Sequence, residues 1–472
     1  MFLLILYVYF VSFLDKPEKT APQLSPRAVE QRAKWHIPTD GMDYPVSPKY
    51  MNDLSKKGVK ILHKSRWFNG VTCEMDTATA AEVAKLSFVT GVEMTRDNSA
   101  PIYGAPKRRF QHSAVSLQSS DPAWTEKQLA LYNLTPLHEA GFEGQGILMT
   151  VCDGGFYNAD QLSCFRQKEL QLGAFDFTDD TDDFYGVTGA HGTCCLSTIS
   201  GIAERYHGAA VKAQYYLMRS EEVENNRESP KEMDNLVAAL EKADSLGVNV
   251  FSVSLGYALF DNDAWTLDKT TDLDGRTTRA SRAATIAARK GMLVCVAAGN
   301  EGNSAWRTIS APADADSILT VGAVTVDSLI GVFSSYGPSS DGRVKPDVCA
   351  VGVQSTLINA DGTIVRNNGT SFATPLLAGL AASLWSALPD ENAMQIRERI
   401  IRSADRYATP DYRQYGYGIP DAWKAYTMKM PEGMETVKGY GLPVTGQKIL
   451  RDGQILIRRG DKTYSITGQI VE

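Results

Sequence analysis

The stretch GILMTVCDGG, residues 146–155, decides the fold. It is an almost wholly apolar run that ends in a carboxylate and two glycines, which is typical of a buried strand followed at once by a turn. Four other runs share this apolar character: 213–218, 248–254, 292–298 and 318–324. Helical periodicity marks the segments 191–201, 231–246, 277–290 and 371–388. Strands that alternate with helices predict an α/β fold, a parallel central sheet flanked by helices.

The pattern changes on both sides of this central region, which we place at residues 124–430. Residues 1–98 mix strand-like and helix-like segments, such as VKILHKSRWFNGVTCEM (59–75), and predict a small α+β domain. Residues 99–123 are polar, contain proline and are interpreted as a linker. Residues 431–472 hold short alternating strands separated by Asp-Gly and Gly-Asp, which predicts a short C-terminal β appendage.

Two apolar segments raise the question of a membrane. The run MFLLILYVYFVSFL (1–14) is too short to span a bilayer, has no basic residue before it and no clear cleavage site after it. Its β-branched and aromatic residues suit a buried strand, but an atypical export signal stays open. The nearly uncharged segment 372–388 contains Pro375 and Gly379, so we interpret it as a central helix buried on all sides.

Composition excludes several classes of protein. Hydrophobic residues make up 43% and charged residues 22%, which is close to the average of globular proteins and excludes a wholly disordered chain. The 48 basic and 55 acidic residues give a net charge of −7 with no basic tract, so nucleic acid is not the expected partner. The seven cysteines form no C-x-x-C pair and are best interpreted as buried thiols.

Three reactive side chains stand beside glycine at the boundary of a predicted element. Asp153 ends the strand quoted above, His191 opens a helix within GAHGT (189–193), and Ser371 opens another within NGTSFATP (368–375). Each alone has an ordinary structural interpretation: a loop carboxylate, a solvated histidine and a helix cap. Together they supply a hydroxyl nucleophile, a base with a pKa near neutrality and a carboxylate to orient it. A fourth group, Asn300, ends a predicted strand and offers an amide N–H to an oxyanion.

These motifs resemble those of the subtilisin-like serine proteases. The matching segments are DGG (153–155), HGT (191–193), SLG (254–256), AAGN (297–300) and GTSFATP (369–375). The resemblance implies Asp153 as the orienting acid, His191 as the general base and Ser371 as the nucleophile. It further implies Asn300 as the oxyanion donor, and Ser254, Leu255 and Gly256 as the segment that binds extended substrate. Gly154 departs from the family, which usually has serine or threonine after the aspartate.

The N-terminal region resembles the propeptide of secreted subtilisin-like proteases, with a plain accessory domain as the alternative. The resemblance implies a secreted or cell-surface endopeptidase that is made as a zymogen and matured by cleavage between residues 98 and 124. Its expected partners are protein or peptide substrates and its own propeptide, with no nucleic acid and no membrane apart from export. The C-terminal residues resemble short sorting appendages of exported proteases, and a simple stabilising hairpin is the alternative.

No cofactor and no metal are expected for the reaction. The acidic cluster of Asp179, Asp180, Asp182 and Asp183 could hold a structural calcium ion, although a solvated loop is the favoured interpretation. Two other functions stay open: a catalytically silent binding protein that kept the fold, and a metal-dependent hydrolase built on His191, Cys194 and Cys195.

Overall fold

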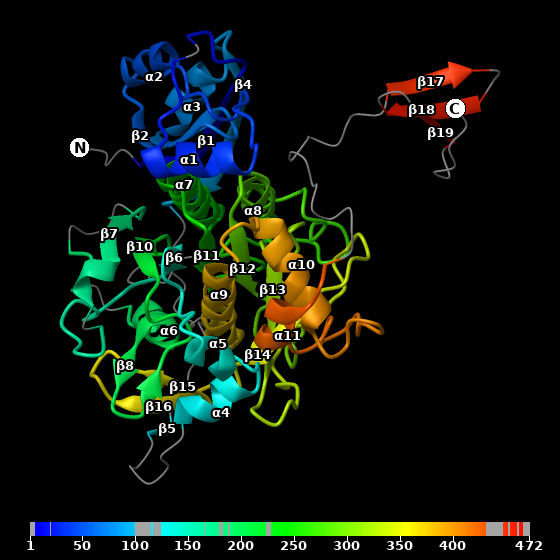
Figure 1. Cartoon of the computed structure of the whole chain (residues 1–472). Coiled ribbons are helices and arrows are strands. Elements are labelled where there is room, and N and C mark those ends of the chain that lie inside the picture. The colour runs from blue at the N-terminus through cyan, green and yellow to red at the C-terminus, as the bar shows by residue number, and fades with distance from the viewer. Residues whose placement is uncertain are drawn as a thin grey trace.

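The computed structural model describes most of the chain in three parts. The described residues are 5–18, 20–99, 115–116, 124–165, 167–178, 183–186, 189–222, 228–430, 447–451, 454–459 and 462–465. A large α/β unit carries a smaller N-terminal unit, drawn in blue above it in Figure 1. A separate three-stranded sheet lies near the C-terminus.

The large unit is built on a seven-stranded sheet in the order β14-β13-β12-β11-β6-β10-β7, and every neighbouring pair is parallel. Its strands are β6 (Leu148–Asp153), β7 (Gln171–Asp176), β10 (Gln214–Arg219), β11 (Val250–Val253), β12 (Leu293–Ala297), β13 (Leu319–Val324) and β14 (Val348–Val351). The predicted parallel sheet is confirmed. The two edge strands, β7 and β14, were not predicted, because β7 is half-exposed and lacks an apolar run and β14 is only four residues long.

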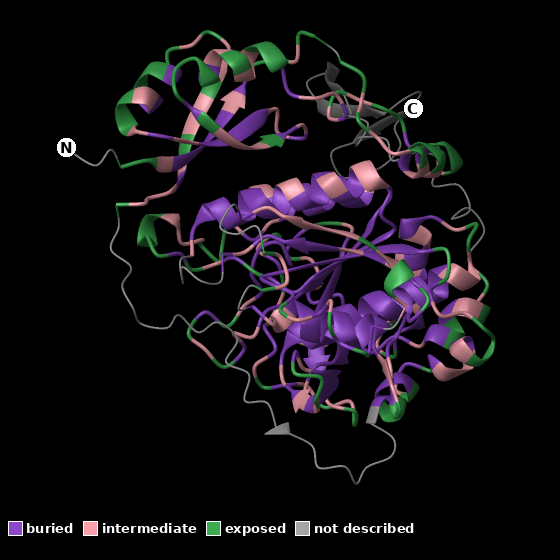
Figure 2. Cartoon of the chain, turned by 90° about the vertical axis from the view of Figure 1, so that its left-hand side faces the viewer, coloured by how far each residue is buried: buried purple, intermediate pink, exposed green. Residues whose placement is uncertain are grey.

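Helices cover both faces of this sheet. They are α6 (His191–Ser200), α7 (Pro230–Leu246), α8 (Arg279–Arg289) and α9 (Thr370–Ala387). Because successive side chains of a strand point to opposite faces, Met149 and Val151 join the core cluster under α6 and α9, while Leu148 and Cys152 join the cluster under α7 and α8. Figure 2 shows the resulting buried interior.

Helix α9 is the predicted central helix. Every residue from Thr370 to Trp385 is buried, and the helix packs against α6 and against strands β11 to β14. Its apolar character therefore reflects the protein interior. Among the described residues, none of the helices combines the length and the apolar character needed to cross a bilayer.

The N-terminal unit is an α+β domain with an antiparallel sheet in the order β2-β3-β1-β4. Its elements are β1 (Tyr7–Phe13), α1 (Pro26–Lys34), α2 (Pro48–Ser55), β2 (Lys60–Ser65), β3 (Gly70–Met75), α3 (Thr77–Val83) and β4 (Val89–Arg96). Strand β1 pairs with both β3 and β4, and Val11 at its centre is fully buried. The strand interpretation of this apolar run is confirmed for Tyr7–Phe13.

The remaining elements are short. They are β5 (Val115–Ser116), α4 (Trp124–Ala130), α5 (Thr135–Glu139), η1 (Lys168–Leu170), β8 (Ile202–Ala203), β9 (Tyr206–His207), η2 (Asp263–Trp265), β15 (Ser355–Ile358), β16 (Ile364–Asn367), α10 (Ala393–Ser403), α11 (Ala422–Thr427), β17 (Gln447–Arg451), β18 (Gln454–Arg459) and β19 (Lys462–Ser465). Strand β5, within the segment interpreted as a linker, pairs with β16 of the large unit. Three residues of the possible calcium cluster, Asp179, Asp180 and Asp182, lie outside the described residues.

Candidate active site

Three of the predicted site residues follow neighbouring strands of the central sheet. Asp153 is the last residue of β6, Ser254 comes directly after β11, and Asn300 follows β12. These strands are adjacent in the order β12-β11-β6. Since parallel strands end at the same edge of a sheet, the three residues gather there, which is where α/β folds carry their sites.

Helix α6 brings His191 to this edge. His191 Nδ1 lies 2.7 Å from Asp153 Oδ1, and the two residues form a hydrogen bond. The helix begins against the loop that follows Asp153, where Gly192 N–H donates to the Gly155 carbonyl at 2.9 Å. A Cβ at position 192 would stand 2.6 Å from that carbonyl oxygen and 2.9 Å from the Asp153 Cβ, so only glycine permits this approach.

Asp153 is fully buried, and hydrogen bonds from its neighbours hold its carboxylate in one orientation. Its Oδ1 accepts a second hydrogen bond from the Gly154 backbone N–H at 2.8 Å. Its Oδ2 is buried and accepts no hydrogen bond from any residue that the structure describes. Gly154 has no side-chain hydroxyl to offer the carboxylate, and the contact with His191 is made by Oδ1.

Ser371 lies in the first turn of α9, beside His191. The His191 ring is 5.5 Å, centroid to centroid, from the ring of Phe372, the next residue along α9. Two hydrogen bonds tie the segment to the end of β11: Ser254 Oγ donates to the Ser371 carbonyl at 2.8 Å, and Ser371 Oγ donates to the Ser254 carbonyl at 3.4 Å. Asp153 and His191 are thus directly bonded, and Ser371 is joined through Ser254 to the end of β11, the neighbour of the strand that carries Asp153.

Asn300 is oriented by a residue that the sequence analysis missed. Its Oδ1 accepts hydrogen bonds from both the backbone N–H and the hydroxyl of Thr370, each at 2.9 Å. The Thr370 hydroxyl also accepts from the Gly299 N–H at 3.2 Å. With Oδ1 occupied, the Nδ2 group is left to donate, and it lies near Gly369, where a Cβ would stand 3.6 Å from it. Thr370 precedes Ser371 directly, so its position in the motif was the available signal.

The segment after β11 presents backbone at the surface. Ser254 and Leu255 are buried, but Gly256 is exposed. Tyr257 forms an antiparallel bridge with Ala311, which fixes the segment. A Cβ on Gly256 would stand 2.3 Å from Ser310 Oγ, so another segment of the same chain packs closely against Gly256.

The two adjacent cysteines of α6 differ in their surroundings. Cys195 Sγ donates to the Ser371 carbonyl at 3.3 Å and lies 3.8 Å from His191 Nδ1, whereas Cys194 Sγ faces Asn359 Oδ1 at 3.7 Å. Asp153, His191 and Cys195 have potential ligand atoms within 4.8 Å of one another, and Cys194 is not part of this group. Burial raises the pKa of the Cys194 thiol to about 12 and that of Cys195 well above its ordinary value, so both thiols keep their protons.

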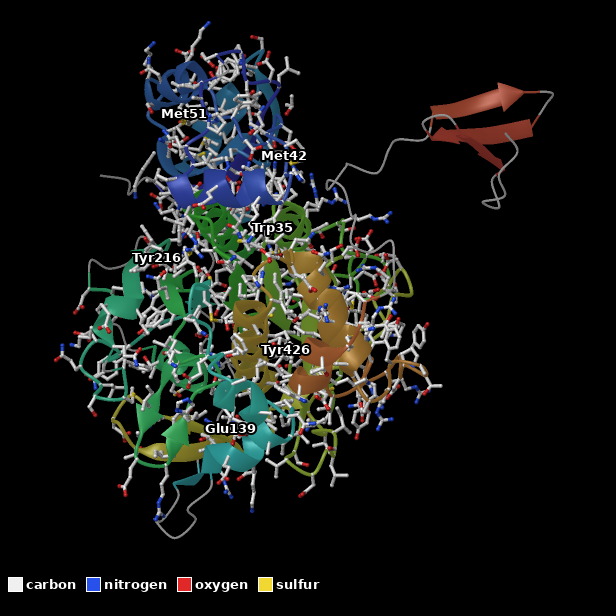
Figure 3. All side chains as sticks on the ribbon, viewed as in Figure 1. Trp35, Met42, Met51, Glu139, Tyr216 and Tyr426 are labelled. Carbon is white, nitrogen blue, oxygen red and sulfur yellow. The ribbon has the colours of Figure 1, made fainter. Side chains whose placement is uncertain are left out.

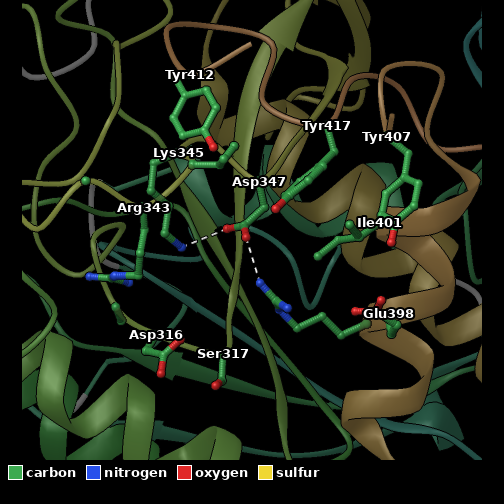
Figure 4. A pocket seen from close by; sticks show the side chains of 14 residues that line it. Asp316, Ser317, Arg343, Lys345, Asp347, Glu398, Ile401, Tyr407, Tyr412 and Tyr417 are labelled. Carbon is green, nitrogen blue, oxygen red and sulfur yellow. Dashed lines mark hydrogen bonds and ion pairs between the residues drawn. The ribbon is translucent and has the colours of Figure 1, made fainter. Parts of the chain in front are cut away.

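A cavity of about 400 Å³ lies apart from these residues, between the segments 315–347 and 397–417 (Figure 4). At its floor the buried Asp347 pairs with Lys345 Nζ and Arg397 Nη2, each at 2.7 Å. Burial alone would raise the pKa of Asp347, but these two cations hold it below its ordinary value. The pair of Asp347 with Arg397 joins the residue before β14 to α10, and we interpret the cavity as structural.

The N-terminal unit is docked on α7 through buried polar contacts. Glu241 of α7 accepts hydrogen bonds from Ser65 Oγ at 2.6 Å and from the backbone N–H groups of Arg66 and Trp67 at 2.9 and 3.2 Å. Asp244, one turn later, pairs with Arg66 at 2.5 Å and with Arg32 at 2.8 Å. Both carboxylates of α7 therefore accept hydrogen bonds from the N-terminal unit, and Asp244 is also paired with two of its arginine side chains.

The N-terminal unit also completes the end of α7. Ser25 N–H donates to the Ser245 carbonyl at 2.8 Å, its hydroxyl donates to the Leu246 carbonyl at 3.0 Å, and Arg27 Nε donates to the Gly247 carbonyl at 3.1 Å. Carbonyls at a helix end have no partner within the helix. The start of α1 supplies those partners.

Comparisons with known proteins agree with this geometry. Residues 144–418, more than half of the chain, match the model of the subtilase family, peptidase S8. Residues 8–113 match the model of the peptidase S8 propeptide domain of Bacteroidota. The chain is 26% identical to serine protease AprX of Bacillus subtilis (strain 168) over 311 residues, which covers 59% of this chain and 66% of that protein.

Two further proteins are similar to this chain, one in sequence and one in fold. The chain is 26% identical to subtilisin NAT of Bacillus subtilis subsp. natto, covering 79% of this chain and 84% of that protein. Its fold is similar to the crystal structure of MycP1 from Mycobacterium smegmatis, with a TM-score of 0.53 and 23% identity over 68% of this chain and 89% of that one. The chain therefore belongs to the subtilase family, as a serine endopeptidase with an N-terminal propeptide domain.

Proposed function

We propose that this protein is a secreted or cell-surface endopeptidase that hydrolyses peptide bonds through an acyl-enzyme on Ser371. The observation that carries the proposal is the 2.7 Å contact between Asp153 and His191 beside the first turn of α9, where Ser371 lies. A hydroxyl needs a base near neutral pKa to become a nucleophile, and a base needs an oriented partner to stay in the right tautomer.

The proposed reaction uses four side chains. Ser371 Oγ attacks the peptide carbonyl while His191 Nε2 takes its proton, and Asp153 stabilises the imidazolium through Nδ1. The oxyanion of the tetrahedral intermediate accepts hydrogen bonds from Asn300 Nδ2 and the Ser371 backbone N–H. His191 then protonates the leaving amine, and water hydrolyses the acyl-enzyme by the reverse sequence of proton transfers.

Substrate recognition is proposed at Ser254, Leu255 and Gly256. An extended peptide can pair with the backbone of this segment as an added strand. Such pairing recognises the main chain of the substrate more than its side chains. The exposure of Gly256 and the bonds that tie Ser254 to Ser371 support this placement, because they set the strand at a fixed distance from the nucleophile.

We further propose that residues 1–98 form an inhibitory propeptide, that 124–430 form the catalytic domain and that maturation cuts between residues 98 and 124. Most of that cleavage region lies outside the described residues. The hydrogen bonds to Glu241 and the capping of α7 support a domain that assists folding and stays bound after cleavage.

A fluorophosphonate probe tests the mechanism. We expect it to label the processed wild-type enzyme and to fail on Ser371→Ala, since the probe reacts only with an activated serine. Ser386→Ala, on the same helix, is the matched control and should label normally. A processed, folded wild type that takes no label would contradict the mechanism and favour the catalytically silent binding protein.

N-terminal sequencing of the expressed enzyme tests maturation. If cleavage is autocatalytic, Ser371→Ala accumulates the uncleaved precursor. Normal trimming of that variant would assign the cleavage to another protease. Recovery of active enzyme from the cytoplasm alone, with none exported, would contradict the proposed location.

A further inference from the structure

Three potential metal ligands that the proposed mechanism does not use meet near the end of α9 that lies opposite to the nucleophile. They are His138 on α5, Glu143 in the loop that follows, and His207 on β9. Their ligand atoms lie within 4.8 Å of one another. We propose that His138, Glu143 and His207 form a structural zinc site.

The pair formed by Glu143 and His207 already has the spacing of two ligands. His207 Nε2 lies 3.0 Å from Glu143 Oε1. Ligands at about 2.0–2.1 Å from a tetrahedral zinc ion stand about 3.3 Å apart, so little movement is needed to place the ion between them. Zinc would replace the proton that the two side chains now share.

The contacts of Glu143 and His138 show which of their atoms are available to an ion. Lys212 competes with an ion for Glu143 because it pairs with Oε2, while Oε1 faces His207. His138 Nε2 is hydrogen-bonded to the Ala209 carbonyl at 3.1 Å. Metal-bound histidines ordinarily donate their second ring N–H to a backbone carbonyl in this way.

The site is open to an incoming ion. His138 and His207 line a cavity of about 420 Å³ together with residues of α4 and α5. Two nitrogen ligands and one carboxylate suit zinc, and the cavity leaves room for water in the fourth position. The side chain of Lys212 is 48% exposed, so it can turn into solvent as the ion enters.

The distance between this site and Ser371 indicates that the ion has a structural role. Ser383 of α9 donates to the same Ala209 carbonyl at 2.7 Å, so the cluster adjoins the helix that carries Ser371. Twelve residues of helix separate Ser383 from Ser371, which is about 18 Å. The ion would join α5, the loop at Glu143 and β9 without touching the reaction.

Zinc binding to the full chain tests the proposal. The chain carries Ser371→Ala to prevent autolysis, is stripped with a chelator and is titrated with Zn²⁺ by calorimetry. We expect saturable binding of one ion and a higher thermal midpoint. His207→Ala and Glu143→Gln should each weaken zinc binding by at least about tenfold. Loss of a group that only hydrogen-bonds to a metal ligand already costs about 10–100-fold in affinity, and these variants remove the ligands themselves. Because all readouts are binding and stability, they stand whether or not Ser371 is the nucleophile.

Two further variants sharpen the result. Lys212→Met removes the competing cation and should tighten binding roughly two- to five-fold, the effect of one exposed charge pair. Glu139→Gln, on α5 at the rim of the same cavity (labelled in Figure 3), is the matched control and should bind as the parent does.

Cobalt distinguishes this site from the group of Asp153, His191 and Cys195. Bound Co²⁺ should show ligand-field bands without a thiolate charge-transfer band, because no cysteine is a ligand. The proposal is overturned if no saturable binding occurs, if His207→Ala and Glu143→Gln bind as the parent does, or if binding disappears in Cys195→Ser and persists in His207→Ala.

Discussion

Thr370 holds the side chain of Asn300 from two directions, with its backbone N–H and its hydroxyl each 2.9 Å from Asn300 Oδ1. The residue next to the proposed nucleophile thereby fixes the amide that is proposed to receive the oxyanion. Preorganised donors of this kind stabilise a transition state because they need not reorient during the reaction.

Thr370→Val should lower kcat roughly tenfold with little change in KM, since it removes one of the two hydrogen bonds, about 1–1.5 kcal/mol. Asn300→Ala should lower kcat about 10²–10³-fold, the range measured for the corresponding donor in subtilisin, a member of the same family. Steady-state kinetics on a peptide substrate measure both.

A control and a double variant complete this test. Thr374→Val, also buried on α9, loses a hydroxyl that bonds only within the helix and should keep its kcat. The double variant of Asn300 and Thr370 should be no slower than Asn300→Ala alone. Additive losses would show that Thr370 does not act through Asn300.

Arg32→Ala should loosen the docking of the N-terminal unit. The substitution leaves Asp43 and Asp244 without their shared guanidinium, and breaking a buried pair costs about 3–5 kcal/mol. Urea unfolding of the Ser371→Ala chain measures the loss. Lys85→Ala removes an exposed pair in the same unit and should cost at most about 1 kcal/mol. Equal effects of the two variants would contradict the buried network.

The contribution of Asp43 should depend on pH. Burial alone would raise its pKa, but hydrogen bonds from Lys290, the Asp40 backbone and Arg32 hold it below the ordinary value of 3.8. A lowered pKa in the folded state stabilises the fold above 3.8, and this stabilisation is lost as the pH falls through the folded-state pKa. Asp43→Asn should therefore cost about 1–3 kcal/mol at pH 7 and progressively less below pH 3.8. A cost that stays constant from pH 7 to pH 3 would argue against the ionised pair.

Val11→Ala should destabilise the N-terminal unit by about 1.5–3 kcal/mol, because the side chain is fully buried in β1, one of the two inner strands of the sheet. Val29→Ala, on α1 of the same unit, is the matched control, since Val29 is 54% exposed. Thermal unfolding of the precursor measures both. If Val11→Ala lowers the thermal midpoint no more than Val29→Ala does, the run 7–13 does not function as a strand of the folded precursor.

Much of the fold could be predicted because runs of apolar residues indicate the buried strands and the central helix without knowledge of their partners. The apolar runs that became β6, β10, β11, β12 and β13 carry no charge in their interiors, and α9 follows from its length and apolar residues. Edge strand β7 was missed because a half-exposed strand has no such run. For Tyr7–Phe13 composition allowed both a strand and an export signal, and only the partners β3 and β4 identify the strand.

By itself the sequence determined which chemistry is available. Asp153 and Asn300 follow predicted strands, whose ends share one edge of a parallel sheet, and His191 and Ser371 each open a predicted helix. Only the tertiary structure decided how these groups are held. Three contacts join segments that lie far apart in the chain. They are the orientation of Asn300 by Thr370, the docking of Arg32 and Ser65 on α7, and the approach of His207 to His138 and Glu143. Such contacts depend on the packing of whole elements, and no local pattern of residues encodes that packing.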